Sequence, residues 1–371
     1  MRILVPNLGS TSLKLQVLDM DDETVLVHRR VSAIGSPGAP RDHRAAMELL
    51  FGDVDGPVDG IGLKTVHGGP RFTESCLVTD EVVEAMTVFL GVAPAHNAIY
   101  LEAIAILRDL LPGTPMAAVF ETAFHRTIPD ASRLYGVPYE WAERYGIRRY
   151  GFHGASHRYV SEQVHERRLV SCHLGGSSSV CAILDGRSVD TSFGFSLQSG
   201  LVQGSRCGDL DPFAVLHLLR DFDRGELARM LYKKSGLLGL SGVSGAMREV
   251  EAAAAAGDDR AALAVDVFVH GVVREIGACA AVLGGIDALA FAGGIGENSP
   301  TLRARICAGL GFLGIELDPE RNLDPEATGG AVSPDDGSVP VVVVRTNEEL
   351  VVARETARVL GGVRQTKEVT T

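Results

Sequence analysis

The sequence lacks paired cysteines, a basic excess and any long apolar run. Its six cysteines are scattered without a C-x-x-C pair, which excludes a disulfide framework and the common zinc spacings. The net charge is −12, whereas nucleic-acid binding calls for a basic surface. The longest apolar runs, such as VPVVVV at 339–344, are too short to cross a bilayer. We therefore expect no nucleic-acid partner and no membrane partner. With no signal peptide visible, we expect a cytoplasmic location.

What is present is a soluble globular composition, with 46% apolar and 22% charged residues. A chain of 371 residues predicts about two domains. Two stretches resemble each other without gaps: ILVPNLGSTSLKLQVLD at 3–19 and LVSCHLGGSSSVCAILD at 169–185. Both predict strand, Gly/Ser turn, strand, and both continue toward a third strand. The pattern predicts two related halves that open with the same β-hairpin, and chance similarity between two Gly/Ser turns is the alternative.

The rest of the chain alternates helices and strands, which predicts an α/β protein. Helical spacing of apolar residues predicts helices over 97–111 and 259–284. Buried strands are expected at 287–294 and 339–344, the second followed by a helix capped by Thr346 or Asn347. We expect the link between the halves near 146–160.

Two glycine-containing turns are candidate anion sites. Gly9 to Ser12 could direct backbone N–H groups at a phosphate, with Lys14 nearby as a point charge; the alternative is a solvated loop. FAGGIGENSP at 291–300 places glycines between a strand and a helix, which suits nucleotide contact near a helix N-terminus. A tight turn capped by Asn298 and Ser299 is equally compatible, and the dinucleotide fingerprint is incomplete.

Two further stretches carry side chains suited to chemistry. His153 and His157 are four residues apart, but the glutamate of H-E-x-x-H and a third ligand are missing, so hydrogen bonding is favoured over zinc. Arg206 lies between glycines and beside Asp209 and Asp211. Its planar fork of donors suits a transferring phosphoryl group, and a surface ion pair is the alternative.

Read together, these stretches resemble the acetate kinase family of short-chain carboxylate kinases. The resemblance runs along the chain in the family's order through NLGSTSLK, VHGG, AHNA, VFETAFHRTIP, RRYGFHGASHRYV, CHLGGSSS, GSRCGDLDP, GGIGEN and TNEEL. It implies the duplicated sugar kinase/actin-like ATPase fold with ATP and magnesium (Mg²⁺ or Mn²⁺) bound between domains, and a homodimer. The domains implied are 1–150, with the helix 347–371 packing back on it, and a nucleotide-binding domain 151–346.

The resemblance also implies roles for individual residues. The magnesium positions are Asn7 and Glu348. The catalytic positions are Glu121, His153 and Arg206, of which the last two stabilise the transferring phosphoryl group. The substrate positions are Lys64, Val66, Ala95, His96, Phe152 and Leu197. The nucleotide positions are Lys14, His173, Gly175, Gly176, Ser177, Ala246, Met247, Arg248, Gly293, Gly294, Ile295, Gly296 and Glu297.

The sequence departs from the family at several of these positions. Lys64 stands where the family has the arginine that grips the substrate carboxylate, and Glu121 replaces an aspartate. Gly176 replaces an asparagine of the second phosphate loop, and Ala246 replaces an aspartate near the nucleotide. These changes predict a divergent member of the family.

Two departures concern the acyl pocket. Ala95 and Leu197 replace a leucine and a proline that line it in the family. We expect a reversible, ATP- and magnesium-dependent kinase that converts a small carboxylic acid other than acetate to its acyl phosphate. The alternatives are a pyrophosphate-dependent carboxylate kinase and an inactive nucleotide- or metabolite-binding paralogue.

Overall fold

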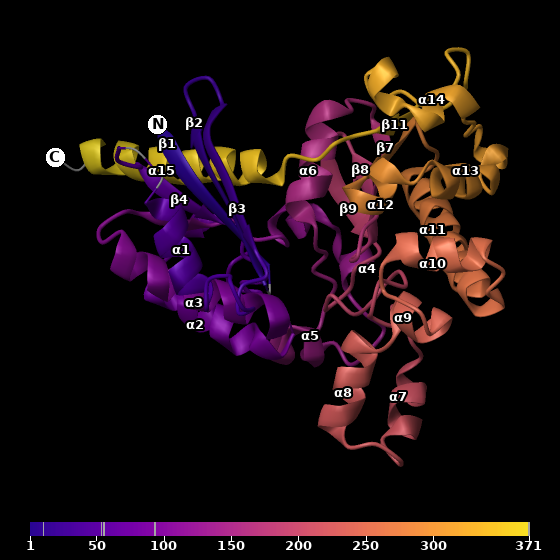
Figure 1. The fold of residues 1–371 in the computed structure, drawn as a ribbon, viewed down its shortest axis with the longest axis horizontal. Helices are drawn as coiled ribbons and strands as arrows, with labels where there is room; N and C mark the ends of the chain where they lie inside the picture. The colour runs from indigo at the N-terminus through magenta and orange to yellow at the C-terminus, as the bar shows by residue number, and fades with distance from the viewer. Residues whose placement is uncertain (10, 53, 55, 93, 370–371) are drawn as a thin grey trace. The chain divides into compact units, whose positions relative to one another are not determined.

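The computed structural model describes residues 1–369 except 10, 53, 55 and 93, and of 94–96 and 363–369 it describes the backbone alone (Figure 1). The chain divides into two compact units. Unit 1 is Met1–Arg126 with Asn347–Thr371, and unit 2 is Thr127–Thr346. Within the described part, no helix is both long enough and apolar enough to cross a membrane.

Unit 1 is built on one mixed sheet. In spatial order its strands are β3 (Thr24–Ser32), β2 (Ser12–Asp19), β1 (Arg2–Gly9), β4 (Gly60–Leu63), β6 (Met116–Ala118) and β5 (Cys76–Leu77). The first three strands are antiparallel, whereas β1, β4 and β6 run parallel. Its helices are α1 (His43–Phe51), α2 (Asp80–Val88), α3 (Pro94–Leu110) and α15 (Glu348–Val369).

Helices cover both faces of this sheet, which is why β1 reads as a continuous apolar run. Ile3 and Val5 pack in one cluster with Val352 of α15, whereas Leu4 packs into the larger cluster shared with α1 and α3. Figure 1 shows α15 crossing the strands of this unit at an angle, and it contacts β4, β1 and β6. Gly62 of β4 allows the close approach, because a Cβ there would lie 2.8 Å from Val352 Cγ1.

Unit 2 repeats the same topology. Its strands in spatial order are β11 (Val341–Val343), β10 (Ala288–Ala292), β7 (Arg168–His173), β8 (Ser179–Leu184) and β9 (Arg187–Thr191). The antiparallel meander β7–β8–β9 corresponds to β1–β2–β3, and the parallel strands β10 and β11 correspond to β4 and β6. The two related halves and the duplicated actin-like ATPase fold are thus confirmed.

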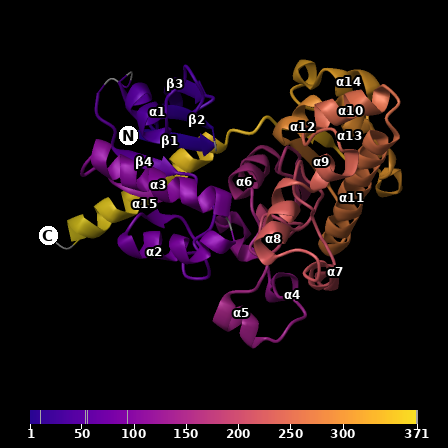
Figure 2. The same cartoon turned by 60° about the horizontal axis from the view of Figure 1, so that its bottom comes forward.

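The helices of unit 2 include one of 25 residues that spans a sheet face. α11 (Asp259–Leu283) packs on β7, β8 and β9, and α6 (Gly154–Gln163) contacts β7 and β10. Figure 2 shows α11 beside α13 within this unit. The other helices are α4 (Asp130–Arg133), α5 (Glu140–Tyr145), α7 (Pro212–Leu218), α8 (Arg224–Lys233), α9 (Gly236–Ser241), α10 (Met247–Ala255), α12 (Gly293–Asn298), α13 (Pro300–Ala308) and α14 (Pro319–Leu323).

The division of the chain differs from the expected boundary at residue 150. Arg149 Nη1 donates to the Thr191 carbonyl at 2.6 Å, and Tyr150 N donates to the Gly194 carbonyl at 3.0 Å. Because these bonds tie the segment after Thr127 to unit 2, the unit begins before the expected link at 146–160. Composition does not mark this boundary, since long-range hydrogen bonds set it.

Candidate active site

In unit 1 the first hairpin brings an amide and an ammonium to one carboxylate. Asn7 of β1 and Lys14 of β2 are cross-strand partners, so their side chains lie on the same face. Asn7 Nδ2 and Lys14 Nζ donate to Glu349 Oε1 at 2.9 and 3.1 Å. Burial alone would raise the pKa of Glu349, but the bond from Asn7 and the charge of Lys14 lower it.

The tight connection in this hairpin involves two residues. Gly9 pairs with Ser12, which leaves only residues 10 and 11 between the strands. Ser10, part of the expected phosphate turn, lies outside the described residues. Gly9 has little room for a side chain, because a Cβ would lie 2.7 Å from Ser12 Oγ.

A second ionic group lies just after β4. Lys64 Nζ donates to Glu348 Oε2 at 2.5 Å and lies 3.9 Å from Glu121 Oε1. Burial alone would lower the pKa of Lys64, but the two carboxylates outweigh it and raise that pKa. The backbone holds Glu121 beside Lys64, since Glu121 N donates to the Thr65 carbonyl at 2.9 Å. The lysine, the glutamate and one predicted metal ligand are therefore assembled in one place.

The predicted acyl-binding residues of unit 1 are placed in part. Val66 is buried, and Asn97 Nδ2 fixes the next carbonyl by donating to His67 O at 3.1 Å. The backbone of Ala95 and His96 belongs to the first turn of α3. The side chains of Ala95 and His96 lie outside the described residues.

In unit 2 three histidines gather around β7, β8 and the start of α6. His153 Nδ1 lies 2.9 Å from Ser179 Oγ, and His157 Nε2 lies 2.8 Å from the same oxygen. The His153 ring lies against the His173 ring, with 4.1 Å between centroids and a tilt of 33° between the planes. The hydrogen-bonding interpretation of this pair is thus confirmed. The described residues contain no group of three or more His, Cys, Asp or Glu side chains that could hold a metal.

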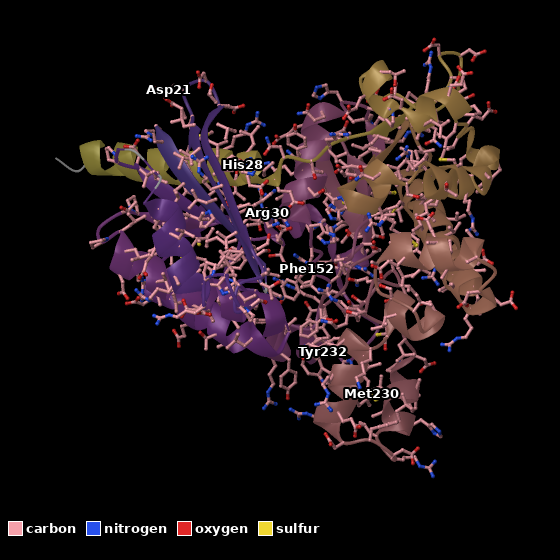
Figure 3. The ribbon with its side chains drawn as sticks, viewed as in Figure 1. Asp21, His28, Arg30, Phe152, Met230 and Tyr232 are labelled. Atoms are coloured by element: carbon pink, nitrogen blue, oxygen red, sulfur yellow. The ribbon has the colours of Figure 1, made fainter. Side chains whose placement is uncertain are left out.

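His153 is held in an uncommon backbone conformation. Its φ is +57° at the N-cap of α6, a left-handed conformation that a non-glycine residue adopts at some cost. Phe152 (Figure 3) is fully buried and meets Phe193 edge-on at 5.6 Å between centroids. Phe193 also meets the His153 ring at 5.1 Å, so this packing helps to fix the imidazole.

Arg206 is a half-buried cation held by neutral groups. Its Nη1 donates to Ser177 Oγ at 3.1 Å, Gln203 Oε1 at 3.0 Å and the Leu197 carbonyl at 3.4 Å. Burial lowers the pKa of Arg206. No ion pair to Arg206 occurs among the described residues, so the surface ion pair weighed as the alternative is not found. A desolvated guanidinium with neutral acceptors is suited to an incoming anion.

The second Gly/Ser turn lies at the end of β7. Gly175 N donates to Ser178 Oγ at 3.1 Å, and the Gly176 carbonyl accepts from Gly204 N at 3.0 Å. A Cβ on Gly176 would meet nothing within 4 Å. Sterics therefore do not require glycine there, and the change from asparagine removes a polar side chain without a packing reason.

Predicted nucleotide residues line a cavity of about 570 Å³ in unit 2. Met247 and Arg248 of α10 and Gly294 and Ile295 of α12 contribute to its wall. Ala246 is the N-cap of α10 and makes no side-chain cap bond, whereas an aspartate at that position could accept from the first turn. The cavity is large enough for a nucleoside.

The glycine-rich segment beside this cavity has a defined backbone. Gly293 has φ +76°, and a Cβ there would lie 2.7 Å from the Leu174 carbonyl oxygen. Gly293 N donates to Glu297 Oε1 at 3.0 Å, and Arg303 Nη1 donates to the carbonyls of Gly296 and Glu297 at 2.8 and 3.0 Å. The segment forms α12 itself rather than a loop that precedes a helix.

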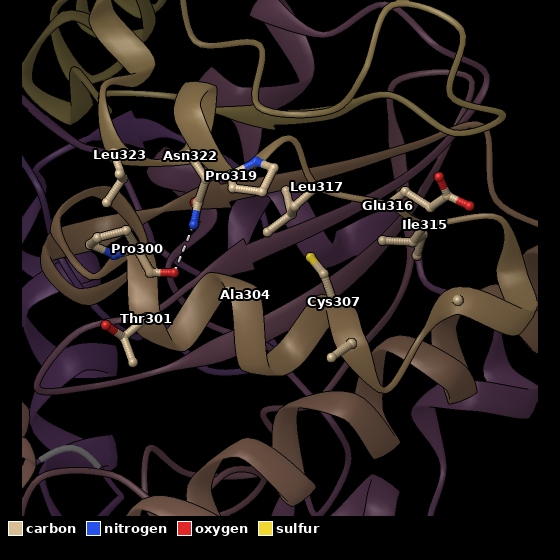
Figure 4. Close-up of a pocket in the computed structure, with 12 residues that line it drawn as sticks. Pro300, Thr301, Ala304, Cys307, Ile315, Glu316, Leu317, Pro319, Asn322 and Leu323 are labelled. Atoms are coloured by element: carbon tan, nitrogen blue, oxygen red, sulfur yellow. Dashed lines mark hydrogen bonds between the residues drawn. The ribbon is translucent and has the colours of Figure 1, made fainter.

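A second cavity, of about 670 Å³, lies between α13 and α14. Figure 4 shows Cys307, Leu317 and Leu323 in its wall, with Asn322 Nδ2 donating to the Pro300 carbonyl at 2.9 Å. None of the predicted site residues lines this cavity.

The structure adds residues that sequence reasoning missed. Glu349, next to the predicted Glu348, binds Asn7 and Lys14; the second acid in TNEEL was the available signal. Gln203 is fully buried and bonded to Ser177 and Arg206; no sequence signal distinguishes it.

Comparison with known proteins identifies the family of this chain. The model of the acetokinase family matches residues 42–354. The acetate kinase of Dictyoglomus thermophilum is 43% identical over 97% of this chain and 100% of its own length. A propionate kinase from Francisella tularensis superimposes with a TM-score of 0.90 at 33% identity, covering 96% of this chain and 99% of its own. The acetate kinase of Porphyromonas gingivalis superimposes with a TM-score of 0.85 at 34% identity, covering 97% of this chain and 99% of its own.

The match over nearly the whole chain and the duplicated topology point to the same family. The family's members are kinases that phosphorylate a carboxyl group with ATP. The chain therefore belongs to the acetokinase family and is a phosphotransferase with a carboxyl group as acceptor.

Proposed function

We propose that the protein transfers the γ-phosphoryl group of ATP reversibly to a small carboxylic acid other than acetate, with Mg²⁺ or Mn²⁺ required. The observation that carries phosphoryl transfer is Arg206. Its half-buried guanidinium donates to neutral acceptors of Ser177, Gln203 and Leu197. Since phosphoryl transfer relies on positioning and charge neutralisation, a preorganised cation of this kind suits the transition state.

The other residues divide between anchoring and transfer. We assign Glu121, His153 and Arg206 to the reacting groups, and the cavity lined by Met247, Arg248, Gly294 and Ile295 to the nucleoside. The turn at Gly175, Gly176 and Ser177 would hold phosphate oxygens through backbone N–H groups, with Lys14 and His173 as further contacts.

The donors offered for the cation are hard oxygen ligands. Asn7 and Glu348 present amide and carboxylate oxygens, and Mg²⁺ in phosphate chemistry commonly takes one or two such groups with water and phosphate oxygens. These residues therefore fit the ion. Charge neutralisation of the phosphates would come from it, while Lys64 forms an ion pair with Glu348 at 2.5 Å.

The identity of the carboxylic acid is the more specific part of the proposal. Lys64 offers one ammonium shared by Glu348 and Glu121, where the related arginine offers two prongs, so the carboxylate needs contacts elsewhere. Ala95 is shorter than the leucine that the resemblance implies there, which favours a longer acyl group, whereas Leu197, in place of a proline, argues partly against this. Glu121 could accept from a substrate hydroxyl or amine.

A hydroxamate-trapping screen of carboxylic acids with magnesium-ATP tests this directly, because acyl phosphates react with hydroxylamine. The series is acetate, propionate, butyrate, isobutyrate and their hydroxy and amino derivatives. Each methylene that is buried should gain about 0.8 kcal/mol, roughly fourfold in kcat/KM, until the pocket is full. A series that peaks at acetate would show that the substitutions compensate one another. Product with pyrophosphate in place of ATP would favour a pyrophosphate-dependent carboxylate kinase. No product with either donor would favour an inactive nucleotide- or metabolite-binding paralogue.

We also propose a homodimer in the cytoplasm. Leu210, Phe213, Leu216 and Leu219 recur at three-residue spacing on and beside α7 and are all exposed. An apolar stripe of this kind is typical of an interface. Sedimentation velocity of the wild type should give a dimer, and Phe213→Glu should shift it toward monomer. A monomeric wild type would refute the proposal.

A further inference from the structure

Two histidines and two serines of unit 2 form one continuous series of hydrogen bonds. Ser171 Oγ lies 2.9 Å from His157 Nδ1, and His157 Nε2 lies 2.8 Å from Ser179 Oγ. The same Ser179 oxygen lies 2.9 Å from His153 Nδ1. Ser171, Ser179 and His157 are fully buried. We call this series the relay; it ends at His153, the residue assigned above to phosphoryl transfer.

Proton counting leaves two arrangements for a neutral relay. A serine hydroxyl carries one hydrogen, so Ser179 donates to one imidazole and accepts from the other. In the first arrangement His157 Nε2–H donates to Ser179, which donates to His153 Nδ1 and leaves the hydrogen of His153 on Nε2. In the second arrangement every donor is reversed, and His153 carries its hydrogen on Nδ1.

Ser171 distinguishes the two arrangements. In the first, its hydroxyl donates to His157 Nδ1 and is satisfied. In the second, His157 Nδ1–H donates to Ser171, and the serine hydrogen needs another acceptor. The described residues provide no second partner for that hydroxyl, and leaving a buried donor unpaired is costly. The first arrangement is therefore favoured.

We propose that Ser171, His157 and Ser179 are positioning residues that hold His153 as the Nε2–H tautomer. The consequence rests on the function proposed above: phosphoryl oxygens only accept hydrogen bonds, so His153 must present a donor. The contact of the His153 ring with the His173 ring, at 4.1 Å between centroids, then helps to fix the direction of that N–H. Ser171, at one end of the relay, thus determines which nitrogen of His153, at the other end, carries the hydrogen.

Long-range ¹H–¹⁵N correlation spectra of the full-length protein labelled in histidine test the relay without any turnover. His153→Gln and His157→Gln variants assign the two rings. We expect both rings to carry hydrogen on Nε2 in the wild type at neutral pH. Hydrogen on Nδ1 of His153, or on both of its nitrogens, would overturn the proposal.

Ser171→Ala is the sharper variant, since Ser171 bonds to His157 rather than to His153. Loss of the deciding hydroxyl should populate both tautomers of His153. The matched control is Ser188→Ala, which removes another fully buried hydroxyl from the same sheet and should leave both rings unchanged. An unchanged His153 spectrum in Ser171→Ala would also overturn the proposal.

Kinetics separate the relay from the role of His153. Ser179→Ala should lower kcat roughly tenfold, as loss of a partner that orients a functional histidine commonly does, with a smaller change in KM. Ser188→Ala should keep kcat. If the spectra are as expected but kcat is unchanged in Ser179→Ala, the proposed role of His153 in turnover is refuted. The inference that the relay sets the tautomer of His153 would still stand.

Discussion

Asn7 and Lys14 lie opposite each other on neighbouring strands and donate to the same oxygen, Oε1 of Glu349. Glu349 is in the first turn of α15. The start of the last helix is therefore fixed against the first hairpin of the chain by two donors.

Asn7→Asp replaces one of these donors by a second carboxylate at the same place. Two carboxylates within hydrogen-bond distance repel each other, and Glu349 loses one of its two donors, so we expect a loss of about 1–3 kcal/mol in unfolding free energy. Urea denaturation at pH 8 measures it. The loss should shrink at pH 5 because one carboxyl can then bind a proton, and an equal loss at both pH values would contradict this account.

Arg206→Ala should lower kcat about 10²–10³-fold, by analogy with lost transition-state donors. KM should change much less, since an interaction made only in the transition state appears in kcat. Steady-state assays with the preferred acid measure both. Arg206→Lys keeps the charge but loses the fork and should recover little. A normal kcat with a raised KM would make Arg206 a ground-state binding residue.

Glu348→Gln should remove most metal-dependent turnover and change thermal stability little. The amide oxygen can still accept from Lys64, which also keeps its contact with Glu121. Assays over a magnesium titration, with and without EDTA, measure the effect. Glu355→Gln is the control on the same helix, because Glu355 is a buried glutamate that pairs with Arg358 instead of Lys64. The role of Glu348 is refuted if turnover persists in the variant or in EDTA.

The double variant Lys64→Arg, Glu121→Asp lengthens one side chain of a pair and shortens the other. In the wild type, Lys64 Nζ and Glu121 Oε1 are 3.9 Å apart. Each single change alters the reach between them, so each should lower kcat/KM. The double variant should be closer to the wild type than the two losses predict, with a coupling of about 0.5–3 kcal/mol. We also expect its acid preference to move toward acetate. Additive losses would show that the two residues act independently.

Asp287→Asn tests the ion pair between Arg168 and Asp287. The hydrogen bond from Arg168 lowers the pKa of Asp287, so the carboxylate stabilises the fold above the ordinary aspartate value and this contribution is lost as the pH falls. The variant should melt about 1–3 °C lower at pH 7, since solvent screens the pair. The difference should begin to shrink near pH 3.8, the ordinary aspartate value, and disappear only as the pH falls through the lower pKa that Asp287 has in the folded protein. High salt should also reduce it. A difference that persists in acid would point to packing instead.

The order of elements could be predicted from the sequence because it depends on local patterns. The strand expected at 287–294 is β10, and the helix expected over 259–284 is α11. Asn347, one of two candidate caps, accepts from Leu350 N. Apolar periodicity and capping chemistry determine these features within a few residues.

The partners of the site residues could not be predicted in the same way. Lys64 and Glu348 are far apart in the sequence, and their ion pair depends on how α15 packs on β4. Whether Asn7 donates to Glu348 or to Glu349 depends on which side of the helix each glutamate occupies. Gln203 carries no motif, and burial beside Arg206 gives it its role.

Unit 1 is closed by α15, so it is assembled from the two ends of the chain, whereas unit 2 is continuous from Thr127 to Thr346. On a ribosome that adds about 5–20 residues per second, the first hairpin waits roughly ten seconds or more for the helix that covers it. During that time Ile3 and Val5 lack the partner they contact in the finished protein. We therefore expect unit 2 to complete its folding first, and the nascent N-terminal sheet to be the segment that needs protection by chaperones.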